Sequence, residues 1–181
     1  MPTAKIRRAA LAAEGMSVPK RHANIPGTYF VTSRTWQSRA IFKVAPPCEI
    51  FIASLLEYCN AGAYKLHAFV LMPDHFHLLL TPGPDTALER AVQFVKGGSA
   101  RKIREALRFQ FPVWQRGFSD HRIRDAADYD VHLRYLARNP VKKGLVMEPG
   151  EYLWCSASGK YPMEEVPQGL KPLAAAANRH G

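Results

Sequence analysis

Large apolar residues gather along the middle of the chain in the manner of β-strands. Tyr64 to Met72 and His75 to Thr81 are both of this kind, and Pro73-Asp74 between them has the composition of a tight turn. These segments predict a β-hairpin. Thr28 to Trp36 alternates in residue type and predicts an earlier strand, whereas Arg116 to Ile123 predicts a later one.

Two stretches between these strands carry apolar residues at helical spacing. The first runs from Glu49 to Asn60, where Asn60-Ala61-Gly62 is a stop signal. The second can be capped by Asp85 or Thr86 and runs towards Leu107, weakened at Gly97-Gly98 because glycine is a poor helix former.

A last helix is expected from Asp125 through Arg138, because Pro140 prevents its smooth continuation. The predicted order is therefore strand, helix, strand, strand, helix, strand, helix. This order indicates an α+β fold of the ferredoxin-like βαββαβ type, with an antiparallel sheet, helices on one face and an additional C-terminal helix. We expect the domain to span residues 25–158, between a flexible basic arm (1–24) and a flexible tail (159–181).

The basic residues are concentrated in one region. The net charge is +10, and the segment from Arg90 to Arg124 holds nine Lys/Arg against two acids. Such a patch suits the phosphate backbone of a nucleic acid. We expect DNA contacts from Arg101, Lys102, Arg104, Arg116, Arg122 and Arg124. Trp114 or Phe118 could stack on a base, and Trp114 could equally be a core residue.

Cysteine content and hydropathy indicate the cellular compartment. Three cysteines without metal-type spacing imply no disulfide framework, which favours a reducing cytoplasm. No apolar run approaches the length of a membrane span, so no membrane partner is expected.

Two histidines stand at the start of the second hairpin strand. Residues i and i+2 of a strand share a face, so His75 and His77 point the same way, about 7 Å apart at Cα. Two neutral imidazoles can grip one metal ion, with a third ligand from elsewhere. The alternative is a hydrogen-bonded pair without metal.

A helical wheel separates the two tyrosines of the last helix. Tyr129 falls on an apolar stripe with Leu133 and Leu136, so it is expected in the core. Tyr135 falls on a polar row, whose members are Asp128, His132, Tyr135 and Asn139. Asn139 could offer its amide oxygen to a metal or cap the helix before Pro140. Asp128 and His132 could support the site or be solvated surface.

These motifs together resemble a known family. Met72 to His77 is similar to the His-hydrophobic-His motif of HUH endonucleases, and Tyr135 to Val146 resembles the tyrosine helix of REP-associated tyrosine transposases. Those bacterial proteins are relatives of the single-tyrosine IS200/IS605 transposases. Gly27 to Thr32 and Trp114 to Phe118 are similar to other strands of that family, so the resemblance covers about residues 25–158.

The resemblance implies an activity and a site. In this family a tyrosine cleaves single-stranded DNA near hairpins, forms a 5′-phosphotyrosine and frees a 3′-hydroxyl. Carried over, Tyr135 is the nucleophile, and His75, His77 and Asn139 hold Mg²⁺ or Mn²⁺. The insertion-sequence branch has a glutamine where this chain has Asn139. The implied partner is single-stranded DNA with palindromic elements, in the bacterial cytoplasm at the nucleoid. Insertion-sequence relatives are dimers, whereas a monomer is slightly favoured here.

Two other functions fit the same residues. One is a non-catalytic nucleic-acid-binding protein of this fold, with structural histidines. The other is a metal-dependent hydrolase in which His67, His75 and His77 bind Zn²⁺ and water attacks. A hairpin-DNA adduct assay with Mn²⁺ separates the first from the transposase interpretation. In the second, Tyr135→Phe would leave turnover largely intact.

Overall fold

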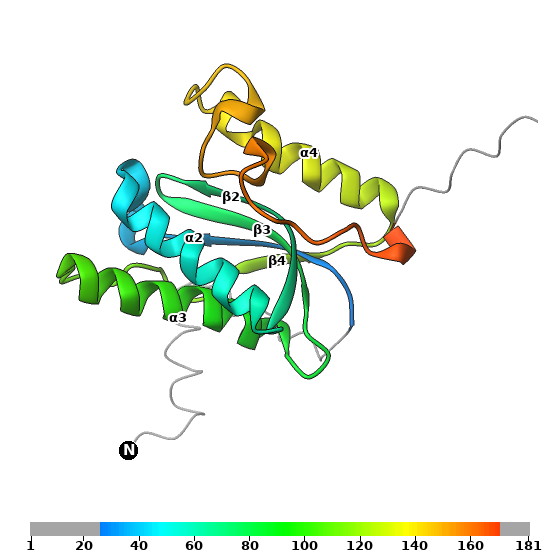
Figure 1. Ribbon diagram of the computed structural model, residues 1–181, viewed down its shortest axis with the longest axis horizontal. Coiled ribbons are helices and arrows are strands. Elements are labelled where there is room, and N and C mark those ends of the chain that lie inside the picture. Colours follow the sequence, from blue (N-terminus) through cyan, green and yellow to red (C-terminus); the bar gives the residue numbers. More distant parts are fainter. Residues whose placement is uncertain (1–25, 171–181) are drawn as a thin grey trace, which may run out of the picture.

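A computed structural model describes residues 26–170, whose core is a four-stranded antiparallel sheet (Figure 1). The strand order is β2-β3-β1-β4, as expected for a ferredoxin-like fold. The main elements are β1 (Tyr29–Arg34), α2 (Ala45–Asn60), β2 (Tyr64–Met72), β3 (His75–Pro82), α3 (Leu88–Leu107), β4 (Ser119–Arg122) and α4 (Ala126–Lys142). Short 3₁₀ helices lie at Trp36–Ser38, Ile41–Lys43, Pro149–Glu151, Ser156–Ser158 and Gln168–Leu170. Within residues 26–170, no helix has the length and apolar character needed to cross a membrane.

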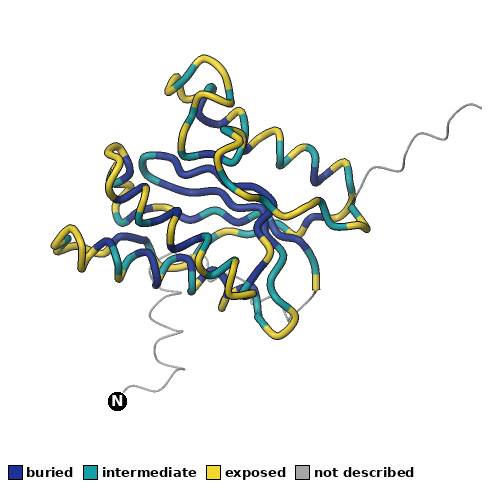
Figure 2. The backbone as a smooth tube through the Cα atoms, viewed as in Figure 1, coloured by how far each residue is buried: buried dark blue, intermediate teal, exposed yellow. Residues whose placement is uncertain are grey.

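The two faces of the sheet are covered by different helices. α2 and α3 cover one face, where Phe76, Leu78 and Leu80 of β3 enter the larger hydrophobic core. α4 lies alone over the other face, above a smaller core that includes Val70 and Leu79. Alternate residues of the same strand therefore supply two cores. Figure 2 shows the resulting buried centre of the sheet and the exposed outer sides of the helices.

The predicted elements occur in the predicted order, with shifted boundaries. α2 starts at Ala45 rather than Glu49, because proline is accepted in the first turn of a helix, where its missing N–H is not needed. α3 starts only at Leu88; its N-cap is Ala87, and neither Asp85 nor Thr86 caps it. The fourth strand has only four residues.

α3 continues unbroken through its glycine pair. Gly98 faces the ring of Tyr58 on α2 so closely that an added Cβ would overlap it. Gly97 has no such neighbour, since an added Cβ would meet nothing within 4 Å. The close approach of two helices explains one of the glycines and leaves the other unexplained.

α4 corrects the prediction that Pro140 ends the last helix. Asp125 caps its start, as expected, by accepting a hydrogen bond from the Asp128 N–H. The helix then runs through the buried Pro140 to Lys142. Pro140 lacks only its own N–H, and the N–H of Lys143 bonds the carbonyl of Asn139, so the last turn still closes. Asn139 is therefore inside the helix and is not its cap.

The packed region extends beyond residue 158, where we expected the domain to end. The chain after α4 runs along the outer edge of β2, where Leu71 N–H bonds the Trp154 carbonyl and Glu164 N–H bonds the Leu66 carbonyl. Val166 and Leu170 pack against the core beneath α4. The predicted arm (1–24) and the end of the predicted tail (171–181) lie outside the described residues.

Candidate active site

His75 and His77 occupy the beginning of β3, on the face that α4 covers. β3 alternates, so both histidines share a face with Leu79 of the smaller core. Their ring centroids are 4.8 Å apart. Both residues are buried, at 8% and 5% exposed. The structure thus brings the pair together, as the i, i+2 spacing predicts.

Each histidine ring is oriented by an oxygen at Nδ1. The Nδ1 of His75 lies 2.6 Å from Oδ1 of Asp74, and the Nδ1 of His77 lies 2.6 Å from Oγ1 of Thr32 on β1. Asp74 also lies 3.6 Å from Arg34, which pairs with His75 across the strands. With Nδ1 donating to these oxygens, Nε2 is the nitrogen left to bind a ligand in both rings.

The environment of His77 keeps its ring neutral. Burial, reinforced by the nearby positive groups of His75 and Arg34, lowers the pKa of His77 to about 3. Its Nε2 is buried and has no hydrogen-bond partner among the described residues. A neutral imidazole with an unused buried nitrogen has the lone pair that a metal ligand needs.

Tyr135 stands over this pair on α4. Its ring is edge-on to that of His77, with 5.2 Å between centroids. Tyr135 is 39% exposed, whereas Tyr129 is 2% exposed and packs in the core, so the helical wheel separated the two tyrosines correctly. Nζ of Lys142 lies 5.5 Å from the centroid of the Tyr135 ring. The nucleophile candidate is thus open to solvent and next to a cation.

Asn139, one turn after Tyr135, points into the protein. It is 4% exposed, and its Oδ1 has no hydrogen-bond partner among the described residues. A buried amide oxygen left without a partner costs about 1–3 kcal/mol. Asn139 and His77 therefore each bury an unsatisfied metal-type ligand atom on the same face of the sheet. This pair of orphaned atoms fits a divalent cation held by His75, His77 and Asn139.

Phe30 on β1 joins the histidines to α4. Its ring stacks on His77 at 5.2 Å between centroids and contacts the rings of His132 (4.7 Å) and Tyr135 (5.8 Å). Sequence reasoning placed Phe30 in a strand but gave it no role. Its position follows from the register, because Phe30 and Thr32 alternate onto the same face of β1 as α4.

Asp128 and His132 form a second polar cluster with His121 of β4. Nε2 of His121 lies 2.8 Å and Nε of Arg124 3.2 Å from Oδ2 of Asp128, and Nδ1 of His132 lies 3.2 Å from Oδ1. Burial disfavours the charged carboxylate, but the hydrogen bonds from His121 and Arg124 outweigh it and lower the pKa of Asp128 to about 2. Asp128 is buried, and His132 is mostly so, which excludes the interpretation as solvated surface.

These three residues could together hold a metal ion. Their ligand atoms lie within 4.8 Å of one another, the one such group of His, Cys, Asp and Glu in residues 26–170. Sequence reasoning missed His121, because no spacing links the short β4 to α4. Unlike His77 and Asn139, these side chains are already satisfied by one another and by Arg124. The hydrogen bonds favour an ion-pair network that fastens α4 to the sheet edge.

The basic residues expected to bind DNA lie on α3, in the loop that follows it and at β4, and they differ in their partners. Arg101 and Arg104 lie side by side on α3. Lys102 instead pairs with Glu57 of α2. The remaining ones lie near β4: Arg116 is exposed in the preceding loop, Arg122 donates to the Pro26 carbonyl, and Arg124 pairs with Asp128.

Trp114 and His67 are both buried and hydrogen-bonded within the protein. Trp114 is buried, stacks on Phe42 and donates from Nε1 to Oγ of Ser99, so it cannot stack on a base. Phe118 is half-buried against the same core. Nδ1 of His67 contacts the Glu165 carbonyl and Nε2 contacts Oγ1 of Thr81. With both ring nitrogens engaged, His67 has none left for a zinc ion shared with His75 and His77.

Comparison with known proteins gives consistent matches. Residues 29–139 match the family model described as "Transposase IS200 like". A provisionally named REP-associated tyrosine transposase of Haemophilus influenzae is 30% identical over 141 residues, covering 72% of this chain and 80% of that protein. A REP-associated tyrosine transposase of Escherichia coli K12 is 24% identical over 155 residues, covering 82% and 90%.

One solved structure has a similar fold. It is described as a REP-associated tyrosine transposase bound to a REP hairpin, and it matches with a TM-score of 0.66 at 23% identity. The match covers 88% of this chain and all of that one. At this identity the likeness concerns the fold, and it agrees with the α+β architecture described above.

Proposed function

This chain belongs to the family of IS200-like transposases, with REP-associated tyrosine transposases among its relatives, and we propose that it cleaves and rejoins single-stranded DNA through Tyr135. The substrate is single-stranded DNA with palindromic, hairpin-forming elements. The observation that carries the proposal is the contact of two rings: the exposed ring of Tyr135 lies edge-on to that of the buried His77. In addition, both His77 and Asn139 bury an unpaired ligand atom.

His75, His77 and Asn139 would hold Mg²⁺ or Mn²⁺. The bound ion supplies electrostatic stabilisation of the negative charge on a phosphate oxygen. Asp74 and Thr32 keep both imidazoles turned with Nε2 towards the site. The low pKa of His77 keeps protons from competing for its ring at neutral pH.

Tyr135 would act as the nucleophile. Its hydroxyl oxygen attacks the phosphorus, and the phenol proton is lost as the new ester forms. The bond from phosphorus to the 3′ oxygen breaks, and that oxygen takes up a proton to become a 3′-hydroxyl. The 5′ phosphate stays on Tyr135, so the energy of the phosphodiester is kept for rejoining. Lys142, beside the ring, places a positive charge where the phosphate arrives.

The exposed arginines would hold the strand. Arg101 and Arg104 on α3, Arg116 in the following loop and Arg122 on β4 present guanidinium groups that suit phosphate oxygens. Lys102 and Arg124 have acidic partners, which reduces their contribution. The similar solved structure, which carries a REP hairpin, supports a hairpin as the DNA partner.

An adduct assay tests the proposal. The purified protein is incubated with a labelled palindromic single strand from beside its own gene, with Mn²⁺, and separated on a denaturing gel. The wild-type protein should yield a covalent protein–DNA band, and Tyr135→Phe should yield none while binding DNA normally. Tyr58→Phe on α2, across the sheet, is the matched control and should yield the band. A normal band from Tyr135→Phe would overturn the nucleophile, and DNA binding without any band from the wild type would favour a non-catalytic binding protein.

A further inference from the structure

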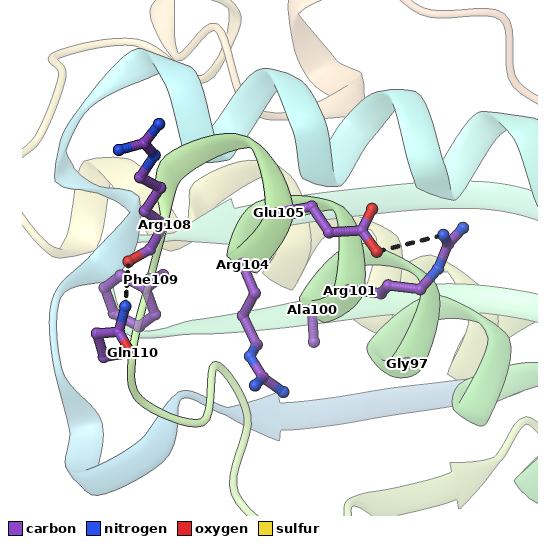
Figure 3. Close-up of a pocket in the computed structure, with 8 residues that line it drawn as sticks. All are labelled: Gly97, Ala100, Arg101, Arg104, Glu105, Arg108, Phe109 and Gln110. Atoms are coloured by element: carbon purple, nitrogen blue, oxygen red, sulfur yellow. Dashed lines mark hydrogen bonds and ion pairs between the residues drawn. The ribbon is translucent and has the colours of Figure 1, made fainter.

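A basic cavity lies on α3, on the sheet face opposite Tyr135. It has a volume of about 750 Å³, within the usual range for small-ligand sites. Gly97, Ala100, Arg101, Arg104 and Glu105 of α3 line one side, and Arg108, Phe109 and Gln110 line the other (Figure 3). The cavity thus combines three guanidinium groups with one carboxylate and one aromatic ring.

Two of the arginines carry unpaired charge. Arg101 is paired with Glu105 at 3.5 Å. In the described part of the chain, neither Arg104 nor Arg108 has an acidic partner within ion-pair distance. Figure 3 shows the side chains of Arg104 and Arg108 extending away from the helix ribbon in opposite directions. Unpaired guanidinium groups at a cavity favour an anion that can accept several hydrogen bonds, and a phosphate group is one.

Gly97 is the second indication of a ligand. Glycine inside a helix costs about 0.5–1 kcal/mol relative to alanine, so it requires a reason. Gly98 has one in the ring of Tyr58, but nothing lies within 4 Å of a Cβ added at Gly97. Gly97 lines the cavity instead. The absence of a side chain at Gly97 therefore leaves space in the cavity, whereas at Gly98 it allows two helices to pack closely.

Aromatic rings continue from the cavity towards the end of the sheet that bears His75. Phe109 contacts Phe111 with 6.2 Å between centroids, and the guanidinium of Arg39 lies 4.2 Å from the Phe111 ring. Phe111 is exposed. The segment with Arg39 is fastened to the turn before His75, because Phe42 N–H bonds the Pro73 carbonyl. Phe109 is half-buried against the larger core, so only part of its ring faces the cavity. Accessible ring surface beside arginines suits unstacked bases, which only unpaired nucleotides offer.

We propose that this cavity binds one unpaired nucleotide of the DNA strand, with its phosphate on Arg104 and its base against Phe109. The strand would pass from the cavity over Phe111 and Arg39 towards His75 and Tyr135. The choice of ligand rests on the function proposed above. The cavity itself is a second site, separate from the site of cleavage.

Binding without cleavage tests this inference. Fluorescence anisotropy with a labelled single-stranded oligothymidine is measured in chelator, using the full chain. Gly97→Leu should project a side chain into the cavity and weaken binding about tenfold, the typical effect of losing one base contact. Gly97→Ala adds only a methyl group and should bind within about twofold of wild type. Both replacements favour the helix, so failure to fold does not account for a loss.

Salt dependence and duplex DNA complete the test. Replacing Arg104 by glutamine should reduce the slope of log affinity against log salt by about 0.7, whereas Lys160→Gln, on the exposed C-terminal segment, is the control and should not. Unchanged binding by Gly97→Leu would overturn the proposal. So would an equal loss on a duplex of the same length, because that indicates a surface that follows phosphates only. These binding measurements do not depend on the Tyr135 adduct assay, because chelator stops cleavage in every sample. A failure of that assay can therefore be distinguished from a failure of this proposal.

Discussion

The ring of Tyr135 meets the ring of His77 edge-on, at 76° between planes and 5.2 Å between centroids. The two residues are 58 positions apart in the sequence, yet Phe30 of β1 contacts both rings. Tyr135 is exposed and His77 is buried, so only the tyrosine side of this contact faces solvent. The Tyr135 side chain is therefore accessible from solvent, whereas Nε2 of His77 is shielded from water.

Replacing Asn139 should raise the stability of the metal-free protein and weaken its binding of metal. Asn139→Leu removes a buried acceptor without a partner, so the free energy of unfolding in chelator should rise by about 1 kcal/mol. The increase in melting temperature on adding Mn²⁺ should shrink, and adduct formation should fall at least about tenfold. Thermal unfolding with and without Mn²⁺ checks this, with Asn139→Gln as the variant that keeps an amide. A full Mn²⁺ response from Asn139→Leu would remove Asn139 from the ligand set.

The low pKa of His77 should make the fold sensitive to acid. The folded-state pKa, about 3, lies below the ordinary value of 6.5, so the unfolded chain binds the proton first as the pH falls. The contribution of His77 to stability is therefore complete above pH 6.5 and decreases as the pH falls towards 3. Between about pH 7.5 and pH 5.5 the wild type should lose about 1.4 kcal/mol more than His77→Gln in urea unfolding. Equal losses would contradict the neutral, buried state of this ring.

The cluster around Asp128 should matter for stability more than for chemistry. Asp128→Asn removes the charge that His121 and Arg124 share, and the lowered pKa corresponds to a loss of about 2 kcal/mol in the free energy of unfolding. His121→Gln should keep Mn²⁺-dependent adduct formation within about threefold of wild type, whereas His77→Gln should abolish it. If His121→Gln abolished the adduct instead, the catalytic ion would belong to the His121, Asp128 and His132 cluster.

The two neighbouring glycines of α3 should respond in opposite directions to the same change. Gly97→Ala should stabilise the protein by about 0.5–1 kcal/mol, because the methyl group meets no atom and the helix gains propensity. Gly98→Ala should destabilise it by about 1–3 kcal/mol, because the new Cβ overlaps the Tyr58 ring, which stacks on Phe94. Chemical denaturation of both variants measures the difference. Stabilisation by Gly98→Ala would mean that α2 and α3 are not packed this closely.

Local sequence pattern was enough to predict the strands, the hairpin and the grouping of His75 with His77, because all of these depend on spacings of a few residues. The wheel of α4 likewise placed Tyr135 and Asn139 on one side and Tyr129 in the core. Local sequence pattern could not predict contacts between distant segments. Examples are the ion pair of His121 with Asp128, the contact of Phe30 with His77, and the cavity at Arg104. Pro140 shows the limit of a local rule, since tertiary packing carries the helix past it.

The C-terminal segment that runs along β2 has a consequence for self-association. An open sheet edge is a template on which a second chain can add a strand, and β2 is a long apolar edge. Hydrogen bonds from Leu71 to Trp154 and from Glu164 to Leu66 occupy that edge, while the opposite edge strand, β4, is only four residues long. A chain cut at residue 158 would lose the bond at Leu66 and bare part of β2. The segment that contains Trp154 and Glu164 thus shields this edge of the sheet from pairing with a second chain.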